Sequence, residues 1–227
     1  PDHPALIKTV VTTPLAQKIA EANGAACFNT FTGFKYMAEK LARLEQEGVY
    51  HYVLAFEESI GYMIGDHARD KDAVVAALLL CEMAAWYHRR GMTVMDGLEE
   101  SWKQYGVYGE NTVNVMLPGE DGMHRMAHIM EALRQAPPAE LGGVTVSAWR
   151  DYSAGVRHCT EGDSPTEISG SNVLYYEFST GEALVIRPSG TEPKIKIYAL
   201  MQGASAPAAD ARAYACAHAA QDLILAL

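Results

Sequence analysis

The first hundred residues alternate short apolar runs with segments of helical periodicity, and this alternation constrains the fold more than any other feature of the chain. Strand-like runs are expected at 9–12, 25–29 and 52–56, and helical segments at 14–23, within 33–48, at 70–90 and at 94–105. Parallel strands need long crossover connections, which such helices provide. The pattern therefore predicts a three-layer α/β domain with a mainly parallel sheet.

A different pattern begins after Tyr105. The segment 105–111 has two glycines and no hydrophobic period, so we expect a domain boundary and a hinge there. The rest of the chain predicts a strand at 111–117, a helix at 119–135, several strands between 144 and 201, and an Ala-rich helix from about 208 to 227. Segregated strands and helices indicate a smaller α+β domain with an antiparallel sheet and helices on one face. The expected domains are residues 1–109 and 110–227.

The charge balance limits the partners of the chain. Eighteen basic against 28 acidic residues give a net charge of −10, which disfavours nucleic acids and anionic membranes as partners. The four cysteines contain no C-x-x-C pair and suit a reducing compartment, and no apolar stretch is long enough to span a bilayer. We therefore expect a cytoplasmic protein. Because residue 1 is proline and a strand follows almost at once, we also expect a piece of a longer polypeptide.

The segment 187–194, Arg-Pro-Ser-Gly-Thr-Glu-Pro-Lys, lies between two strand-like runs. A turn there can direct the hydroxyls of Ser189 and Thr191, and the N–H groups around Gly190, at one anion, while Arg187 adds a guanidinium fork. Lys194 and Lys196 project from one side of the second strand and add charge at the rim. The alternative is a polar β-turn with a solvated arginine. The complete eight-residue string favours a phosphate site.

A second polar segment, 56–62, directly follows an apolar strand, where α/β sheets open their ligand crevices. In an extended chain Glu57 and Ser59 point to one side and Glu58 to the other. A carboxylate and a hydroxyl at that spacing can hold adjacent sugar hydroxyls. The alternative, equally compatible with the residues, is a pair of solvated glutamates and a Ser59 that caps a turn.

Three further groups of residues have simpler explanations. Asp70 and Asp72 suit the N-terminus of the following helix, and Lys71 between them either contacts a ligand in the crevice or belongs to a solvated face. Gly33 lies in a polar loop at a strand end. His124 and His128, at a spacing of four, can bind zinc, but without the glutamate of a metalloprotease motif a solvated helix face is the better interpretation.

Taken together, the segments 56–62, 69–72 and 187–194 resemble the α-D-phosphohexomutase superfamily, particularly its phosphoglucomutase and phosphopentomutase branch. The resemblance covers nearly the whole chain and implies the third and fourth of the family's four domains. It implies that Glu57 and Ser59 grip the sugar hydroxyls, with Gly33 in a loop that senses sugar orientation. Lys71 matches an active-site lysine, either a proton carrier or an electrostatic helper. The residues implied to hold the phosphate that is not transferred are Arg187, Ser189, Gly190, Thr191 and Lys196.

The departures from the family pattern are equally informative. No serine is followed by His-Asn-Pro, as the family's phosphorylated serine is, and no Asp-Gly-Asp-x-Asp-Arg metal loop occurs. The resemblance implies a parent enzyme that interconverts hexose 1-phosphate and hexose 6-phosphate through a phosphoserine and a bisphosphate, using Mg²⁺ and a hexose bisphosphate activator. This chain is expected to be inactive alone, with no cofactor of its own; its partners would be a sugar phosphate and domains 1 and 2. Alternatives are a pentose or mannose mutase, or a non-catalytic sugar-phosphate binding module.

Overall fold

The computed structural model describes residues 2–227 and divides the chain into two compact units. The first unit ends at Gly106 and the second is Val107–Leu227. The sequence placed the division three residues later, after Gly109. The second unit, expected to be the smaller, is the longer of the two.

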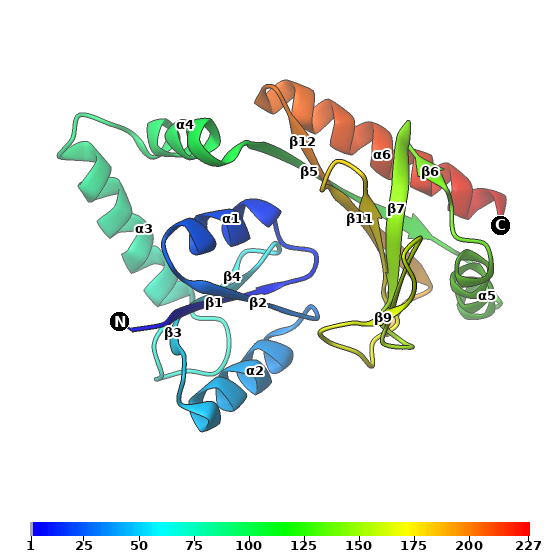
Figure 1. Ribbon diagram of the computed structural model, residues 1–227, viewed down its shortest axis with the longest axis horizontal. Coiled ribbons are helices and arrows are strands. Elements are labelled where there is room, and N and C mark those ends of the chain that lie inside the picture. Colours follow the sequence, from blue (N-terminus) through cyan, green and yellow to red (C-terminus); the bar gives the residue numbers. More distant parts are fainter. Residues whose placement is uncertain (1) are drawn as a thin grey trace. The chain divides into compact units, whose positions relative to one another are not determined.

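The first unit is an α/β/α sandwich. Its sheet has the order β2-β1-β3-β4, in which β1 pairs in parallel with β2 and β3, and β4 pairs antiparallel with β3. Helix α1 lies on one face of this sheet and α2 on the other (Figure 1). The predicted three-layer domain with a mainly parallel sheet is confirmed. Its elements are β1 (Pro4–Thr9), α1 (Pro14–Ala22), β2 (Ala26–Thr30), α2 (Phe34–Glu47), β3 (His51–Glu57), β4 (Gly61–Met63), α3 (Ala73–His88) and α4 (Val94–Tyr105).

Helical spacing explains the core of this unit. Phe34, Met37, Leu41 and Leu44 recur every three or four residues, and all four are buried in one cluster with residues of β1 and β3. Gly48 then ends α2 in the left-handed conformation that glycine adopts without strain.

Two elements of the first unit differ from expectation. Only Thr9 of the run 9–12 is in a strand, as the last residue of β1. Residues 10–12 form a turn in which the Thr12 N–H donates to the Thr9 carbonyl (3.1 Å). The strand lies earlier, from Pro4. The short strand β4 was not predicted, because three residues carry too little periodicity to be recognised.

Helix α3 is apolar but not buried. None of its residues is buried, and Val74 and Leu78 are 81% and 59% exposed. In the part of the chain that the structure describes, no helix is long and apolar enough to cross a membrane.

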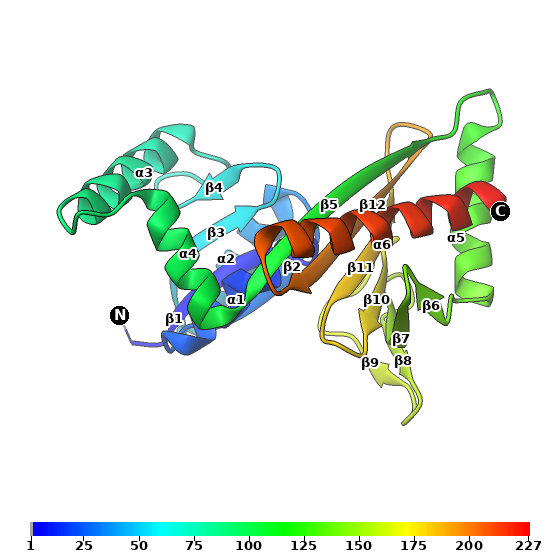
Figure 2. The ribbon, with the colours of Figure 1, turned by 90° about the horizontal axis from the view of Figure 1, so that it is seen from above.

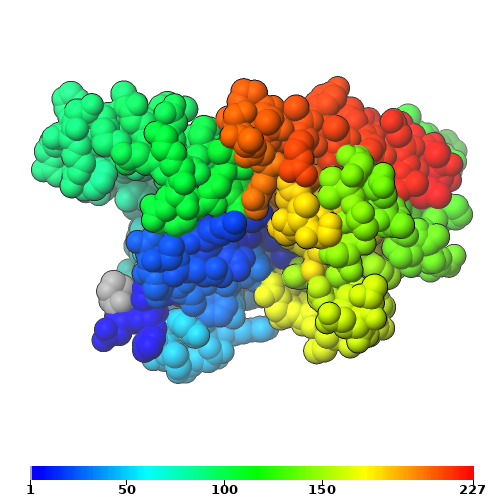
Figure 3. Space-filling view, turned by 45° about the horizontal axis from the view of Figure 1, so that its top comes forward, coloured from blue at the N-terminus to red at the C-terminus, as the bar shows by residue number. Residues whose placement is uncertain are grey.

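The second unit is an antiparallel sheet with helices on one face, as predicted. Its order is β5-β12-β11-β10-β7-β8-β9, with β6 paired to β7. Helix α6 runs along β5 and β12 (Figure 2) and forms one surface of this unit, orange to red in Figure 3. Helices α5 and α6 contribute to the same core cluster. The elements are β5 (Val107–Met116), α5 (Gly122–Gln135), β6 (Glu140–Leu141), β7 (Val144–Asp151), β8 (Val156–Cys159), β9 (Ser164–Pro165), β10 (Leu174–Phe178), β11 (Ala183–Pro188), β12 (Lys194–Gly203) and α6 (Ala206–Ala226).

Residues 107–111 are part of a strand rather than the loop that the sequence suggested. Strand β5 begins at Val107 and pairs with β12 without interruption, so only Gly106 separates it from α4. Gly109 is required by packing rather than by flexibility, because a Cβ there would lie 2.4 Å from the backbone of Ala209 at the start of α6. Two glycines without hydrophobic period suggested a loop, whereas one of them permits a close contact between helix and strand.

Candidate functional site: a sugar loop and a phosphate loop

The segment Glu57–Gly61, here called the sugar loop, is a tight hairpin connection at the carboxyl end of β3. Glu57 pairs with Gly61, so Glu58, Ser59 and Ile60 form the turn. The Ser59 hydroxyl donates to Glu57 Oε1 at 2.9 Å. The exposed hydroxyl and the half-buried carboxylate therefore form one polar pair, while Glu58 turns to the other side and faces Thr9 and Thr12.

Lys71 lies against the sugar loop. A Cβ on Gly61 would be 2.5 Å from the Phe34 ring and 3.0 Å from the Lys71 side chain, so only glycine fits beneath both. The Lys71 ammonium lies 4.8 Å from the centre of the Phe34 ring. This packing brings Lys71 and Gly61 beside the first residue of α2, whose N-cap is Gly33.

Gly33 has a backbone conformation that suits glycine. Its φ is 116°, where other residues are strained, and it makes no side-chain cap, so the N-terminus of α2 is left without one. The structure thus brings Gly33, Lys71 and the sugar loop together at the carboxyl edge of the parallel strands.

The two aspartates beside Lys71 have different partners, contrary to the single explanation given from sequence. Asp72 caps α3, accepting from the N–H groups of Val74 and Val75, and a hydrogen bond with His67 contributes most to lowering its pKa. Asp70 lies before the helix and accepts instead from the Lys71 backbone N–H (2.7 Å) and ammonium (3.1 Å), and the backbone bond contributes most to lowering its pKa. The helix N-terminus therefore explains only Asp72.

In the second unit, the segment Arg187–Lys196, here called the phosphate loop, carries two cations that face one another. Arg187 on β11 is the register partner of Lys196 on β12, so both side chains lie on one face of the sheet. Among the residues that the structure describes, neither forms an ion pair with a carboxylate. Like charges side by side repel unless an anion joins them, so the arrangement favours an anionic ligand.

The backbone of the phosphate loop offers fewer donors than the sequence suggested. The Ser189 N–H closes the hairpin onto the Lys194 carbonyl at 2.8 Å, and the Thr191 N–H approaches the Ser189 hydroxyl at 3.4 Å. Gly190 is exposed, lacks a left-handed conformation, and an added Cβ would meet no atom within 4 Å in the described chain. The backbone of Gly190 is therefore open to approach.

Lys194 does not add free charge to the rim, as the sequence suggested it would. Its ammonium lies 2.5 Å from Glu192 Oε2, and this hydrogen bond is the largest cause of the lowered pKa of Glu192. Lys196 forms no ion pair of its own within the described chain, although its charge also acts on Glu192 from a longer distance.

Sequence reasoning missed a group of residues behind the sugar loop. Lys8 is only 4% exposed, and its ammonium donates to the carbonyls of Thr12 (3.1 Å) and Thr9 (3.3 Å). The hydroxyls of Thr9 and Thr12 in turn approach Glu58. A lysine inside an apolar β-branched run at a strand end was the available signal, since lysine is rarely buried without polar partners.

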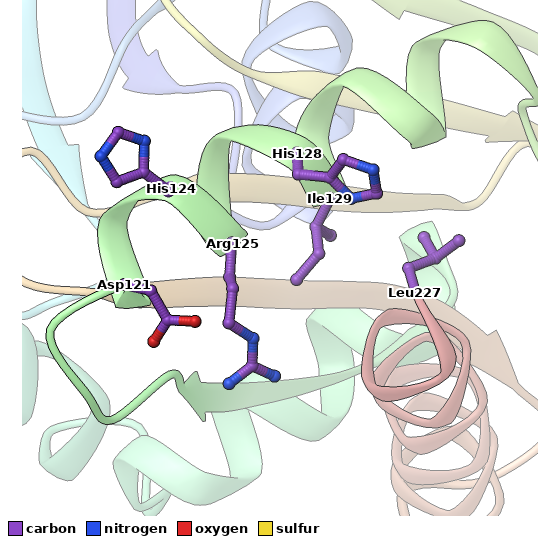
Figure 4. Close-up of a pocket in the computed structure, with 6 residues that line it drawn as sticks. All are labelled: Asp121, His124, Arg125, His128, Ile129 and Leu227. Carbon is purple, nitrogen blue, oxygen red and sulfur yellow. The ribbon is translucent and has the colours of Figure 1, made fainter.

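The histidine pair on α5 lies at a separate pocket of about 240 Å³, whose lining residues are Asp121, His124, Arg125, His128, Ile129 and Leu227. The two imidazole rings lie apart rather than converging (Figure 4). Within residues 2–227 no group of three or more His, Cys, Asp or Glu residues is arranged to hold a metal ion. Asp70 and Asp72 accept hydrogen bonds from other groups and belong to no such cluster in the described chain.

These features define a class of protein, in which an α/β/α domain with a polar loop at its carboxyl edge precedes an α+β domain with a cationic hairpin. Residues 1–105 match the family model for phosphoglucomutase/phosphomannomutase, alpha/beta/alpha domain III. Phosphoglucomutase from Staphylococcus aureus strain N315 is 33% identical over 198 residues, which cover 86% of this chain and 35% of that protein. Residues 1–105 thus belong to domain III of the phosphoglucomutase/phosphomannomutase family, and the similarity to a phosphoglucomutase extends over 86% of the chain.

Solved structures show the same fold. The open form of pp63/parafusin, a phosphoglucomutase from Paramecium, matches with a TM-score of 0.63 and 21% identity, over 98% of this chain and 37% of that one. A phosphomannomutase described as putative from Thermus thermophilus matches with a TM-score of 0.59 and 16% identity, over 99% and 37% of the two chains. This chain therefore spans about a third of the length of its relatives.

Proposed function

We propose that this chain is the sugar- and phosphate-binding part of a phosphoglucomutase-type enzyme, corresponding to domains 3 and 4 of the family. The complete enzyme interconverts hexose 1-phosphate and hexose 6-phosphate through a phosphoserine and a bisphosphate intermediate. The observation that carries the proposal is the pair Arg187 and Lys196, two cations in register on neighbouring strands, neither of which forms an ion pair within 4 Å in the described chain.

Each loop has a distinct role in this proposal. The Glu57 carboxylate accepts hydrogen bonds from two sugar hydroxyls, and Ser59, whose proton now points at Glu57, donates or accepts as the sugar orientation requires. Arg187 and Lys196 hold the phosphate that is not transferred, with Ser189, Thr191 and the Gly190 backbone around it. Lys71, whose ammonium is paired with Asp70 in this structure, lies beside the sugar loop as a proton carrier or an electrostatic helper. Because the site binds the sugar hydroxyls and one phosphate, either phosphate of the bisphosphate intermediate can occupy the phosphate loop. The intermediate can therefore bind in both orientations.

The chain alone should bind but not turn over its ligand. Its sequence has neither the phosphoserine loop nor the acidic metal loop of the family. Mg²⁺, which supplies electrophilic assistance at the phosphoryl group, and a hexose bisphosphate activator therefore belong to the complete enzyme together with domains 1 and 2. We further propose a cytoplasmic location.

A chimera tests this proposal and the sugar preference. The matching segment of the Staphylococcus aureus phosphoglucomutase is replaced by this chain, and turnover of glucose 1-phosphate, ribose 1-phosphate and mannose 1-phosphate is compared. Glucose 1-phosphate should be the preferred substrate, and a chimera with Glu57→Gln should lose most of that activity. A folded chimera that turns over none of the three would contradict the mutase assignment, and a preference for ribose or mannose 1-phosphate would move the chain to the corresponding branch.

A further inference from the structure

We propose that Glu58 is a positioning residue, the anchor that holds the sugar loop in shape from behind. The proposal rests on the proposed function only in that the loop is taken to grip a sugar. Glu58 does not share the face of Glu57 and Ser59. Its Oε2 lies 3.2 Å from the Thr9 hydroxyl and 3.4 Å from the Thr12 hydroxyl, 49 and 46 residues earlier in the chain.

The anchor point is itself rigid. Thr9 and Thr12 are 0% and 2% exposed, and their hydroxyls lie 2.7 Å apart. Two hydroxyls have two protons for three close contacts, so two of the contacts are hydrogen bonds at any one time, and each oxygen still has a partner. Below them the buried Lys8 ammonium donates to both threonine carbonyls, which fixes the turn that presents the hydroxyls.

The loop also carries strain that requires an anchor. Ile60 has a φ of 64°, and a β-branched residue in the left-handed region is an outlier. Its side chain is 83% exposed, so packing of Ile60 does not compensate the strain. Strained residues persist where their surroundings hold them, and they cluster at ligand sites. On one side of Ile60 the loop is tied through Glu58, and on the other through Gly61, which is packed under Phe34 and Lys71.

Three consecutive residues therefore have two different roles. Glu57 and Ser59 face the ligand, and Glu58 fixes the backbone between them, so the pair is already formed before a sugar arrives. A loop that is ordered in advance loses less conformational freedom on binding.

The test uses the 227-residue chain and a matched pair of substitutions. Thr12→Val removes the hydroxyl, whereas Thr12→Ser keeps it; Glu58→Gln keeps the size of the side chain and removes its charge. Hydrogen exchange of amides 58–62 should be at least about tenfold faster in Thr12→Val and in Glu58→Gln than in the wild type, and close to wild type in Thr12→Ser. Exchange in the core strands should not change.

A second readout connects the anchor to binding. Affinity for glucose 1-phosphate should fall at least about fivefold in Thr12→Val and recover in Thr12→Ser. If the wild-type chain binds no sugar phosphate, the proposed function fails in this chain, yet the exchange experiment still decides the anchor. Unchanged exchange in folded Thr12→Val and Glu58→Gln, or an equal acceleration throughout the first unit, would overturn the proposal.

Discussion

At the scale of single residues, Arg187 and Lys196 are like charges in register on neighbouring strands, and neither forms an ion pair in the described chain. Several other cations of this chain have close acidic partners, as Lys194 has Glu192 and Arg69 has Glu45. Cross-strand neighbours of like charge destabilise a sheet. Retaining both cations on adjacent strands therefore has a cost that an anion at this position would offset.

This cost predicts an opposite effect of one substitution on stability and on binding. Without ligand, Lys196→Ala should raise the free energy of unfolding by about 0.2–1 kcal/mol, because it removes the repulsion with Arg187. Urea denaturation measures this change. The matched control is Lys194→Ala, which loses the ion pair with Glu192 and should show no gain. A Lys196→Ala chain that is less stable than wild type would mean that the ammonium has a stabilising role of its own.

A second residue, Glu177, makes part of the stability depend on pH. Its carboxylate bridges Arg150 at 2.6 Å and Arg157 at 2.7 Å. Partial burial acts to raise the pKa of Glu177, but the hydrogen bonds from Arg157 and Arg150 outweigh it and leave the pKa below its ordinary value. The stabilisation is thus present above the pKa of an unfolded glutamate, about 4.3, and is lost as the pH falls through the lower folded value.

The corresponding measurement is denaturation at a series of pH values. Wild-type stability should fall between about pH 5 and pH 3, and Glu177→Gln should be less stable than wild type at pH 7 and show a shallower fall. The Gln variant cannot titrate at this position. Parallel pH profiles for the two chains would show that the bridge contributes nothing to acid sensitivity.

At the scale of elements, two glycines of the second unit have opposite surroundings. Gly109 on β5 touches the first turn of α6, whereas Gly190 in the phosphate loop faces open space. Gly109→Ala should therefore lower the free energy of unfolding by about 1–3 kcal/mol, the usual cost of overpacking. Gly190→Ala should leave stability within about 0.5 kcal/mol of wild type, as surface substitutions do, while weakening phosphate binding. Equal stability losses in thermal unfolding of the two variants would contradict these assignments.

Periodicity predicted most elements because it reflects which face is buried. Helix α2 follows from the spacing of Met37, Leu41 and Leu44, and the antiparallel half from its segregated strands. Prediction failed where a tertiary contact determines the local backbone structure. Val10 and Val11 favour a strand locally, yet hydrogen bonds between Thr9 and Thr12 make a turn there, and Gly109 suggested a loop although α6 packs on it.

The candidate site likewise has features that follow from the local sequence and features that depend on tertiary contacts. An apolar run followed by polar residues predicted that Glu57 and Ser59 lie at the end of a strand, and two such runs predicted that Arg187 lies beside a turn. The partner of Glu58 could not be predicted, because Thr9 and Thr12 lie far from it in sequence and only the parallel pairing of β1 with β3 brings them together. The charges of Lys194 and Lys196 were likewise treated as equal, since sequence does not tell which ammonium Glu192 neutralises.

At the scale of the whole molecule, two units carry two kinds of binding group. The first has a carboxylate and a hydroxyl at the carboxyl edge of a parallel sheet, and the second has unpaired cations on an antiparallel one. A sugar phosphate has both kinds of complementary group, hydroxyls and a phosphate. This chain covers 35% of a curated relative, the phosphoglucomutase of Staphylococcus aureus strain N315.

The central claim is that this chain binds a sugar phosphate through the phosphate loop, and a calorimetric titration tests it most directly. Glucose 1-phosphate should bind the 227-residue chain, and Arg187→Ala should weaken binding about 10- to 100-fold, the loss expected for a charged hydrogen-bond partner. Arg125→Ala, which removes an exposed arginine of α5, should bind as wild type does. Equal affinities in the Arg187→Ala and wild-type chains, or no binding of glucose 1-phosphate at millimolar concentration, would contradict the account.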